Sequence, residues 1–222
     1  MKIAFVGDSF CAEFEQEGNR GYSSWTMMLL NEYNATAIQK GISGDCLFHS
    51  YERLLDHIDE TDLIIVCVSD PDRLANKDTV PMNLHIAEGM EMESPTPKDI
   101  KKASLMYYKY LWHLNFHRAA HLGILTQIDQ LILEKKKKCI WFPCFPNSMY
   151  SKRLGKGYKI TSGPCGTTPL ITYAEQHNPL IPHSNHFSKE QNENMFTLIK
   201  GIIDMNAFES RPIDTNILVN NG

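Results

Sequence analysis

The stretch "KIAFVGDS" at residues 2–9 decides the fold, because a short apolar run ends abruptly in Gly-Asp-Ser. Such a run, bounded by turn residues, is typical of a strand buried in a parallel sheet. Glycine tolerates unusual backbone angles, and Asp and Ser accept hydrogen bonds from the first amides of a helix. The stretch therefore predicts a strand and a strand-to-helix turn. It leaves open whether Ser9 is a nucleophile or only a helix cap.

Other segments repeat this alternation of buried strand and helix. Two further apolar runs are "DLIIVCVSD" at 62–70 and "CIWFPCF" at 139–145, and two weaker strand candidates are "NATAIQKGISG" at 34–44 and "PLITYAEQ" at 169–176. Helical spacing of apolar residues marks 22–33, 47–58, 98–138 and roughly 188–204. A straight helix over all of 98–138 would be roughly 60 Å long. We therefore expect a break at Gly123.

This order predicts a three-layer α/β/α sandwich around a mostly parallel sheet of about five strands. We expect a single domain over 1–205 and a polar C-terminal tail over 206–222. In such sheets, functional residues gather at the carboxyl ends of the strands. Ser9, Gly44 and the turn at 69–73 all follow predicted strands. We therefore expect them to lie at one edge of the sheet.

Net charge, apolar runs and cysteine content indicate which binding partners and which cellular compartment to expect. The net charge of −4 gives no basic footprint, so nucleic acid and anionic membrane are not expected partners. The N-terminal run is too short for a secretory signal, and no window approaches the roughly 18 apolar residues of a membrane span. Six scattered cysteines form no Cys-x-x-Cys pair, which favours reduced, mostly buried thiols and a cytoplasmic setting: Cys11, Cys46, Cys67, Cys139, Cys144 and Cys165.

Four short motifs occur in a characteristic order. They are "VGDSF" at 6–10, "GISG" at 41–44, the polar turn "SDPDR" at 69–73 and "HSNHFS" at 183–188. Together they resemble the SGNH, or GDSL-like, hydrolase superfamily, and the resemblance runs from residue 2 to about 204. It implies a flavodoxin-like sandwich that hydrolyses or transfers an acyl ester, such as O-acetyl on a carbohydrate, without a metal or organic cofactor. The implied partner is a small-molecule or carbohydrate ester.

The resemblance also assigns roles to residues. It implies that Ser9 is the nucleophile and supplies an oxyanion-hole amide, that Gly44 supplies a second amide, and that His186 is the base. Serine catalysis needs such a base, a group that orients it, and donors for the developing oxyanion. The predicted catalytic pair is therefore Ser9 and His186.

Two positions depart from the family pattern. Pro71 stands where the family has an oxyanion-hole Asn, and His183 stands where it has the orienting Asp. The loss of one oxyanion donor costs about 3–4 kcal/mol unless another group replaces it. Ser69 and Arg73 are the candidate replacements for that donor. The candidates for orienting His186 are His183, Asn185, a backbone carbonyl, Asp70 and Asp72.

Other interpretations stay open. A catalytically degenerate protein that binds a glycan or serves in an assembly would share the fold, and so would a flavodoxin-like binding domain. His113, His117 and His121 form a stripe at helical spacing, which favours a polar or partly buried helix face over a metal site. His183, His186 and Cys165 could chelate an ion by residue type alone. The sequence assigns no metal site and no oligomeric state.

Overall fold

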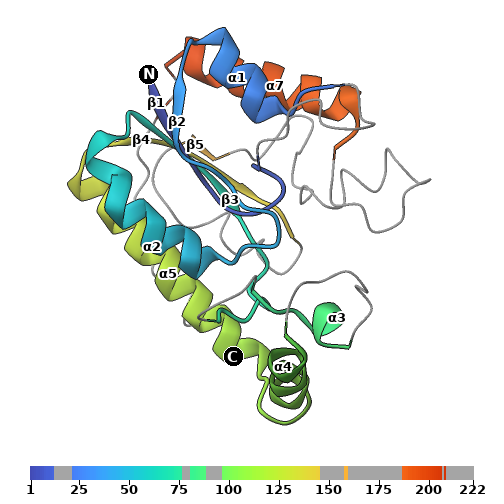
Figure 1. Cartoon of the computed structure of the whole chain (residues 1–222). Coiled ribbons are helices and arrows are strands. Elements are labelled where there is room, and N and C mark those ends of the chain that lie inside the picture. Colours follow the sequence, from blue (N-terminus) through green and yellow to red (C-terminus); the bar gives the residue numbers. More distant parts are fainter. Residues whose placement is uncertain are drawn as a thin grey trace.

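The centre of the fold is a parallel sheet of five strands in the order β2-β1-β3-β4-β5 (Figure 1). The computed structural model describes residues 1–12, 22–76, 81–88, 97–145, 158–159, 187–206 and 208. The strands are β1 (Lys2–Val6), β2 (Thr36–Gln39), β3 (Leu63–Val68), β4 (Lys138–Pro143) and β5 (Tyr158–Lys159). The fold class and four of the expected strands are confirmed. The strand expected at 169–176 lies outside the described residues, and the fifth strand is β5.

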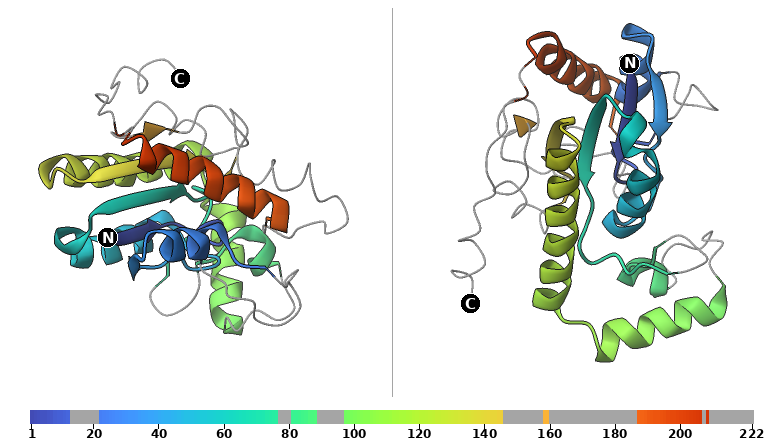
Figure 2. Two further views of the ribbon diagram at one scale, coloured as in Figure 1. Left: turned by 90° about the horizontal axis from the view of Figure 1, so that it is seen from above. Right: turned by 90° about the vertical axis from the view of Figure 1, so that its left-hand side faces the viewer.

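Helices cover both faces of the sheet, as Figures 1 and 2 show. One layer holds α1 (Trp25–Glu32) and α7 (Lys189–Asp204), and the other holds α2 (Leu47–His57) and α5 (Leu114–Glu134). A short 3-10 turn, η1 (Ile58–Glu60), follows α2. The helices α3 (Leu84–Ala87) and α4 (Lys98–Tyr110) lie off the carboxyl end of the sheet, away from both layers.

The core divides into two halves because side chains alternate across each strand. In β1, Ile3 and Phe5 pack toward α1 and α7, whereas Ala4 and Val6 pack toward α2 and α5. All six residues of β3 are buried, as expected for the central strand of a sheet covered on both faces. Trp25 of α1 anchors its layer: its ring packs edge-on against Phe5 at 5.7 Å, measured between ring centroids.

The helical segment 98–138 breaks at a different residue from the one expected. Gly123 lies inside α5, and the break falls at 111–113, between α4 and α5. The Leu111 and Trp112 amides both bond back to the carbonyl of Tyr107, which ends α4. The side chain of His113 then accepts a hydrogen bond from the amide of Phe116 and caps α5. The expectation of a break at Gly123 is therefore wrong, because capping groups at 107–116 end one helix and begin the next.

Replacing Gly123 by alanine should stabilise the protein. Gly123 is exposed, and a Cβ added there would meet no atom within 4 Å. Glycine in an exposed helix interior costs about 0.5–1 kcal/mol relative to alanine, because it loses more backbone entropy on folding. Gly123→Ala should raise the free energy of unfolding, measured by urea titration, by about that amount. A loss of stability would contradict the continuous helix α5.

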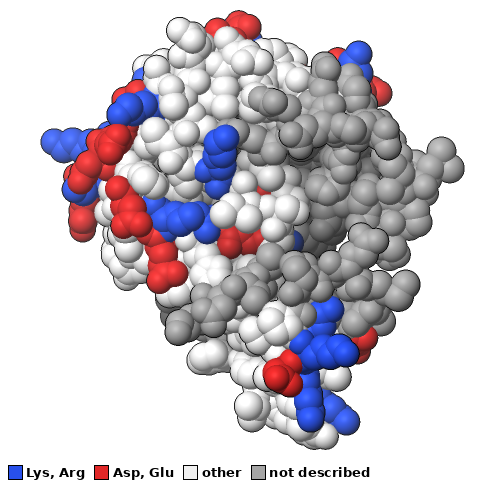
Figure 3. Space-filling view, in the orientation of Figure 1, with Lys and Arg blue, Asp and Glu red and all other residues white. Residues whose placement is uncertain are grey.

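In Figure 3, Lys and Arg side chains lie beside Asp and Glu side chains mainly along the left edge and at the lower end of the face shown. Exposed ion pairs join Lys2 to Glu60 and Lys200 to Glu32. Among the described residues, no helix is long and apolar enough to cross a membrane. The described cysteines are free and buried, as expected: Cys11, Cys46, Cys67, Cys139 and Cys144. Cys165 lies outside the described residues.

Candidate functional site

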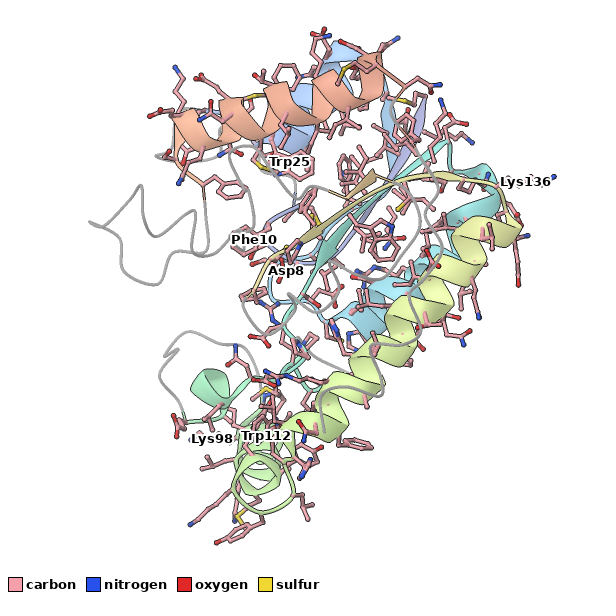
Figure 4. The ribbon with its side chains drawn as sticks, turned by 180° about the vertical axis from the view of Figure 1, so that it is seen from behind. Asp8, Phe10, Trp25, Lys98, Trp112 and Lys136 are labelled. Carbon is pink, nitrogen blue, oxygen red and sulfur yellow. The ribbon has the colours of Figure 1, made fainter. Side chains whose placement is uncertain are left out.

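The first loop of the site follows β1 and holds the predicted nucleophile. Gly7 has φ +147°, and a Cβ there would lie 2.4 Å from the carbonyl oxygen of Cys67, so no other residue fits without strain. Asp8 is fully buried, and its Oδ1 accepts a hydrogen bond from the Phe10 amide at 3.2 Å. Ser9 is buried to 6% exposure at the carboxyl end of β1. Figure 4 shows Asp8 and Phe10 at this edge of the sheet.

The loop after β2 lies directly against the first loop. The amide of Ile42 donates to the carbonyl of Gly7 at 3.3 Å. A Cβ on Gly41 would come within 2.7 Å of the backbone of Cys11, so glycine is required for this approach. Gly44 has φ +79°, in the left-handed region. The structure therefore brings the predicted loops of Ser9 and Gly44 together.

Arg73, in the turn after β3, joins all three loops. Its guanidinium forms a 3.1 Å ion pair with Oδ2 of Asp8 and donates a 2.7 Å hydrogen bond to the carbonyl oxygen of Asp45. It also lies over the ring of Phe145, 5.1 Å from the centroid. Burial raises the pKa of Asp8, and the Arg73 charge opposes that rise. Because Oδ2 of Asp8 has no hydrogen bond among the described residues, this ion pair compensates its charge.

The turn at 69–73 is held by its own backbone and by α4. Oδ1 of Asp70 accepts from the Asp72 amide at 3.0 Å, and the Tyr108 hydroxyl donates to the Asp72 carbonyl at 2.6 Å. Burial raises the pKa of Asp72, and neighbouring Asp70 adds to the rise. The hydroxyl of Ser69 is buried and has no hydrogen-bond partner within the described part of the chain.

The histidine stripe of α5 positions this same turn. Nδ1 of His117 lies 3.3 Å from the carbonyl oxygen of Pro71, and Nε2 lies 2.8 Å from the Tyr107 hydroxyl. A carbonyl can only accept, so Nδ1 donates in this contact. One turn further on, His121 is buried and hydrogen-bonds to the backbone of Ser69. Two histidines of the predicted stripe therefore support the turn, and His113 caps the helix.

His121 should make stability depend on pH. Burial lowers its pKa from 6.5 to about 3, so the unfolded chain binds a proton that the folded chain does not. Stability should therefore fall with pH below about 6.5, by about 2 kcal/mol of unfolding free energy between about pH 7 and about pH 5. His121→Leu should remove this part of the slope, whereas Gly123→Ala on the same helix should keep it. Equal slopes in both variants would contradict the assignment.

The predicted base, His186, and two orienting candidates, His183 and Asn185, lie outside the described residues. The next residue, Phe187, is described and buried. Its ring packs against that of Phe10, with 5.4 Å between centroids. The Phe187 carbonyl accepts from the Tyr22 hydroxyl at 2.8 Å, and Ser188 caps α7 through a capping box with Gln191. Phe187 and Ser188, which directly precede α7, are thus fixed beside the loop of Ser9.

Sequence reasoning missed one buried polar cluster beside Gly44. Asp45 is buried, and its Oδ2 accepts from the Ser50 hydroxyl at 2.7 Å and pairs with the Arg53 guanidinium. Oδ1 of Asp45 faces Nδ1 of His49 at 3.4 Å. The only sequence signal is an Asp before a helix that carries His, Ser and Arg in its first two turns, a pattern that many surface helices share.

Comparison with known proteins finds no matching family model and no matching curated protein. Several solved structures are similar to this chain. One is a protein from Bacteroides fragilis described as an acylhydrolase. It shares 13% identity with a TM-score of 0.42, and the match covers 93% of this chain and 88% of that one. Another is described as a GDSL-like lipase from Parabacteroides merdae, with 14% identity, a TM-score of 0.35, and coverage of 93% and 74%. An acetyl-xylooligosaccharide esterase from Geobacillus stearothermophilus shares 18% identity, with a TM-score of 0.27 and coverage of 63% and 57%.

Proposed function

We propose that this chain is a serine acyl hydrolase that cleaves or transfers an acyl ester, such as O-acetyl on a carbohydrate. One observation carries the proposal: the rings of Phe10 and Phe187 pack together at 5.4 Å. Phe10 follows Ser9 in the sequence, and Phe187 follows His186. The neighbours of the nucleophile and of the base are therefore in contact, although 177 positions separate them in the sequence. A hydrogen bond between the Ser9 hydroxyl and His186 is compatible with this packing.

In this proposal the ester is cleaved in two steps. The hydroxyl oxygen of Ser9 attacks the acyl carbon while His186 takes its proton, and the collapsing intermediate expels the alcohol, which receives that proton. The acyl group is then bound to Ser9. A water molecule, or an acceptor hydroxyl in a transfer reaction, attacks the acyl group with the same help from His186 and restores the free serine.

Three groups at the sheet edge are proposed to stabilise the oxyanion. The amides of Ser9 and Gly44 lie on adjacent loops, which are joined by the hydrogen bond from Ile42 to Gly7. The hydroxyl of Ser69 is the third donor, because it is buried and has no hydrogen-bond partner within the described part of the chain. Arg73 adds positive charge nearby while it holds Asp8 and the Asp45 carbonyl. Donors fixed before the reaction are the main source of such stabilisation.

The candidates for the group that orients His186 are those that the sequence suggested: His183, Asn185, a backbone carbonyl, Asp70 and Asp72. Asp70 and Asp72 lie in the turn after β3, but their described contacts fix that turn. The carbonyl of Asp72 faces α4, and burial raises the pKa of its carboxyl, which disfavours the charged form that an orienting group needs. We therefore favour His183 or a backbone carbonyl as the orienting group, and a Ser-His pair as the minimal catalytic unit.

Covalent labelling tests the proposal directly. A fluorophosphonate probe reacts with a serine only where a base activates the hydroxyl. Mass spectrometry of the labelled protein should find one adduct, on Ser9, and heat-denatured protein should not react. An unlabelled protein, or a label on another serine, would refute the assignment and favour a non-catalytic protein with this fold.

A further inference from the structure

A cluster of metal-ligand side chains lies at the start of α2, beside the loop of Gly44. Asp45, Cys46 and His49 each offer one ligand atom, and these atoms all lie within 4.8 Å of one another. Carboxylate oxygen, thiolate sulfur and imidazole nitrogen together suit zinc, a borderline-soft cation. Asp45 and Cys46 are buried, and the His49 side chain is 22% exposed, which leaves a route from solvent.

The Asp45–His49 contact has the spacing of two metal ligands. Oδ1 of Asp45 and Nδ1 of His49 are 3.4 Å apart, longer than a good hydrogen bond. Two ligands at about 2.1 Å from a tetrahedral zinc ion lie about 3.4 Å apart, and a sulfur ligand lies about 3.6 Å from a nitrogen one. The ligand atoms lie within 4.8 Å of one another, so a shift of the Cys46 sulfur by roughly 1.2 Å toward the other two ligand atoms would complete that geometry.

The groups behind the ligands match those that support metal sites. The second carboxylate oxygen of Asp45 accepts from Ser50 and pairs with Arg53, so Oδ1 is the oxygen left to face His49. Ligating carboxylates are usually held by such outer hydrogen bonds. Burial raises the pKa of the Cys46 thiol, so a metal ion must displace its proton on binding.

We propose that Asp45, Cys46 and His49 bind one zinc ion, with a fourth position open to water. On binding, the Cys46 thiol gives its proton to the solvent and the thiolate bonds to the metal, so the two anions balance the charge of the ion. The simpler interpretation is a plain ion-pair network of Asp45 with Arg53 and His49, and it predicts no metal affinity.

The site is independent of the proposed hydrolysis, which requires no metal. Asp45 follows Gly44, and its carbonyl accepts from Arg73. A bound ion would therefore fix the loop that presents the Gly44 amide. Ser9→Ala should bind zinc as the wild type does, so loss of the hydrolase proposal would leave this one intact.

Cobalt and zinc titrations test the site. Cobalt added to the purified chain should produce a near-ultraviolet thiolate-to-cobalt absorption band, and zinc should remove it. After dialysis, elemental analysis should find one zinc per chain. His49→Ala should weaken binding by more than the ~10-fold that loss of an outer hydrogen-bond partner costs, because it removes a ligand. Cys46→Ser should abolish the thiolate band. His57→Ala, on the same helix but outside the cluster, should bind as the wild type does.

Each result decides the proposal. The His49 side chain is partly exposed, so His49→Ala should fold. This variant therefore tests the site even if Cys46→Ser fails to fold. A wild type without cobalt absorption or zinc affinity would overturn the site. Binding of unchanged affinity in His49→Ala would place the ion elsewhere, and would overturn it equally.

Discussion

Ser9→Ala should lower kcat/KM for p-nitrophenyl acetate by at least ~10³-fold, because it removes the atom that forms the acyl intermediate. The buried Ser9 side chain lies in a loop fixed by Gly7, by the Asp8 side chain and by Arg73. Alanine has nearly the same volume, so the free energy of unfolding should change little. The loss should therefore appear in the rate and leave the stability nearly unchanged.

His186→Ala should show a loss of similar size, and the double variant should be no worse than either single one. Groups that act as one catalytic unit behave in this way, because removing either group stops the same step. Ser104→Ala, at a buried serine of α4, is the matched control and should keep the wild-type rate. Equal rates in the wild type, Ser9→Ala and His186→Ala would eliminate the hydrolase and leave the degenerate binding protein.

The sheet could be predicted from the sequence because its strands are nearly continuous apolar runs. The six residues of β3 are all buried, and a run this short that is rich in Ile and Val and bounded by polar turn residues favours a strand over a helix. The break between α4 and α5 could not be predicted, because it depends on a histidine cap and on the Tyr107 carbonyl rather than on a glycine. Glycine at an exposed helix position costs stability without ending the helix.

The candidate site likewise has features that could be predicted from the sequence and features that could not. The loops of Ser9 and Gly44 could be placed at one edge from topology alone, and the structure confirms that they touch. The role of Arg73 could not be derived, because its partners, Asp8 and the Asp45 carbonyl, are 65 and 28 positions away. The stripe of His117 and His121 was visible in the sequence. Its target at 69–73 depends on how α5 packs against the end of β3.

Arg73→Met should lower the free energy of unfolding by about 3–5 kcal/mol, the usual cost of removing one partner of a buried ion pair. The Asp8 carboxylate would stay fully buried without its only described ionic partner, and the Asp45 carbonyl would lose a hydrogen bond. Methionine replaces the aliphatic part of the side chain, so lost packing contributes little. Urea titration measures the change. Lys135→Met, which breaks the exposed pair with Asp59, is the control and should have a small effect.

The double variant Asp8→Asn/Arg73→Met should recover part of this loss. Asparagine carries no charge to bury, and its side-chain oxygen can still accept from the Phe10 amide, as Asp8 does. The Asp45 carbonyl still lacks the hydrogen bond from Arg73, so the double variant should recover only part of the lost stability. A double variant that is less stable than Arg73→Met by the full cost of Asp8→Asn would show that the two charges do not interact.

The pH dependence of stability should also report the interaction between Asp8 and Arg73. Burial already raises the pKa of Asp8 in the wild type, and Arg73 limits that rise. Without Arg73 the folded-state pKa should rise further above the unfolded value near 3.8, so the folded variant binds a proton that the unfolded chain does not. The stability from this group is then present at low pH and lost as pH rises through the folded pKa. The deficit of Arg73→Met relative to the wild type should therefore shrink as the pH is lowered from neutral toward 4.5. A constant deficit would mean that Arg73 acts through packing and the Asp45 carbonyl, and not through the charge of Asp8.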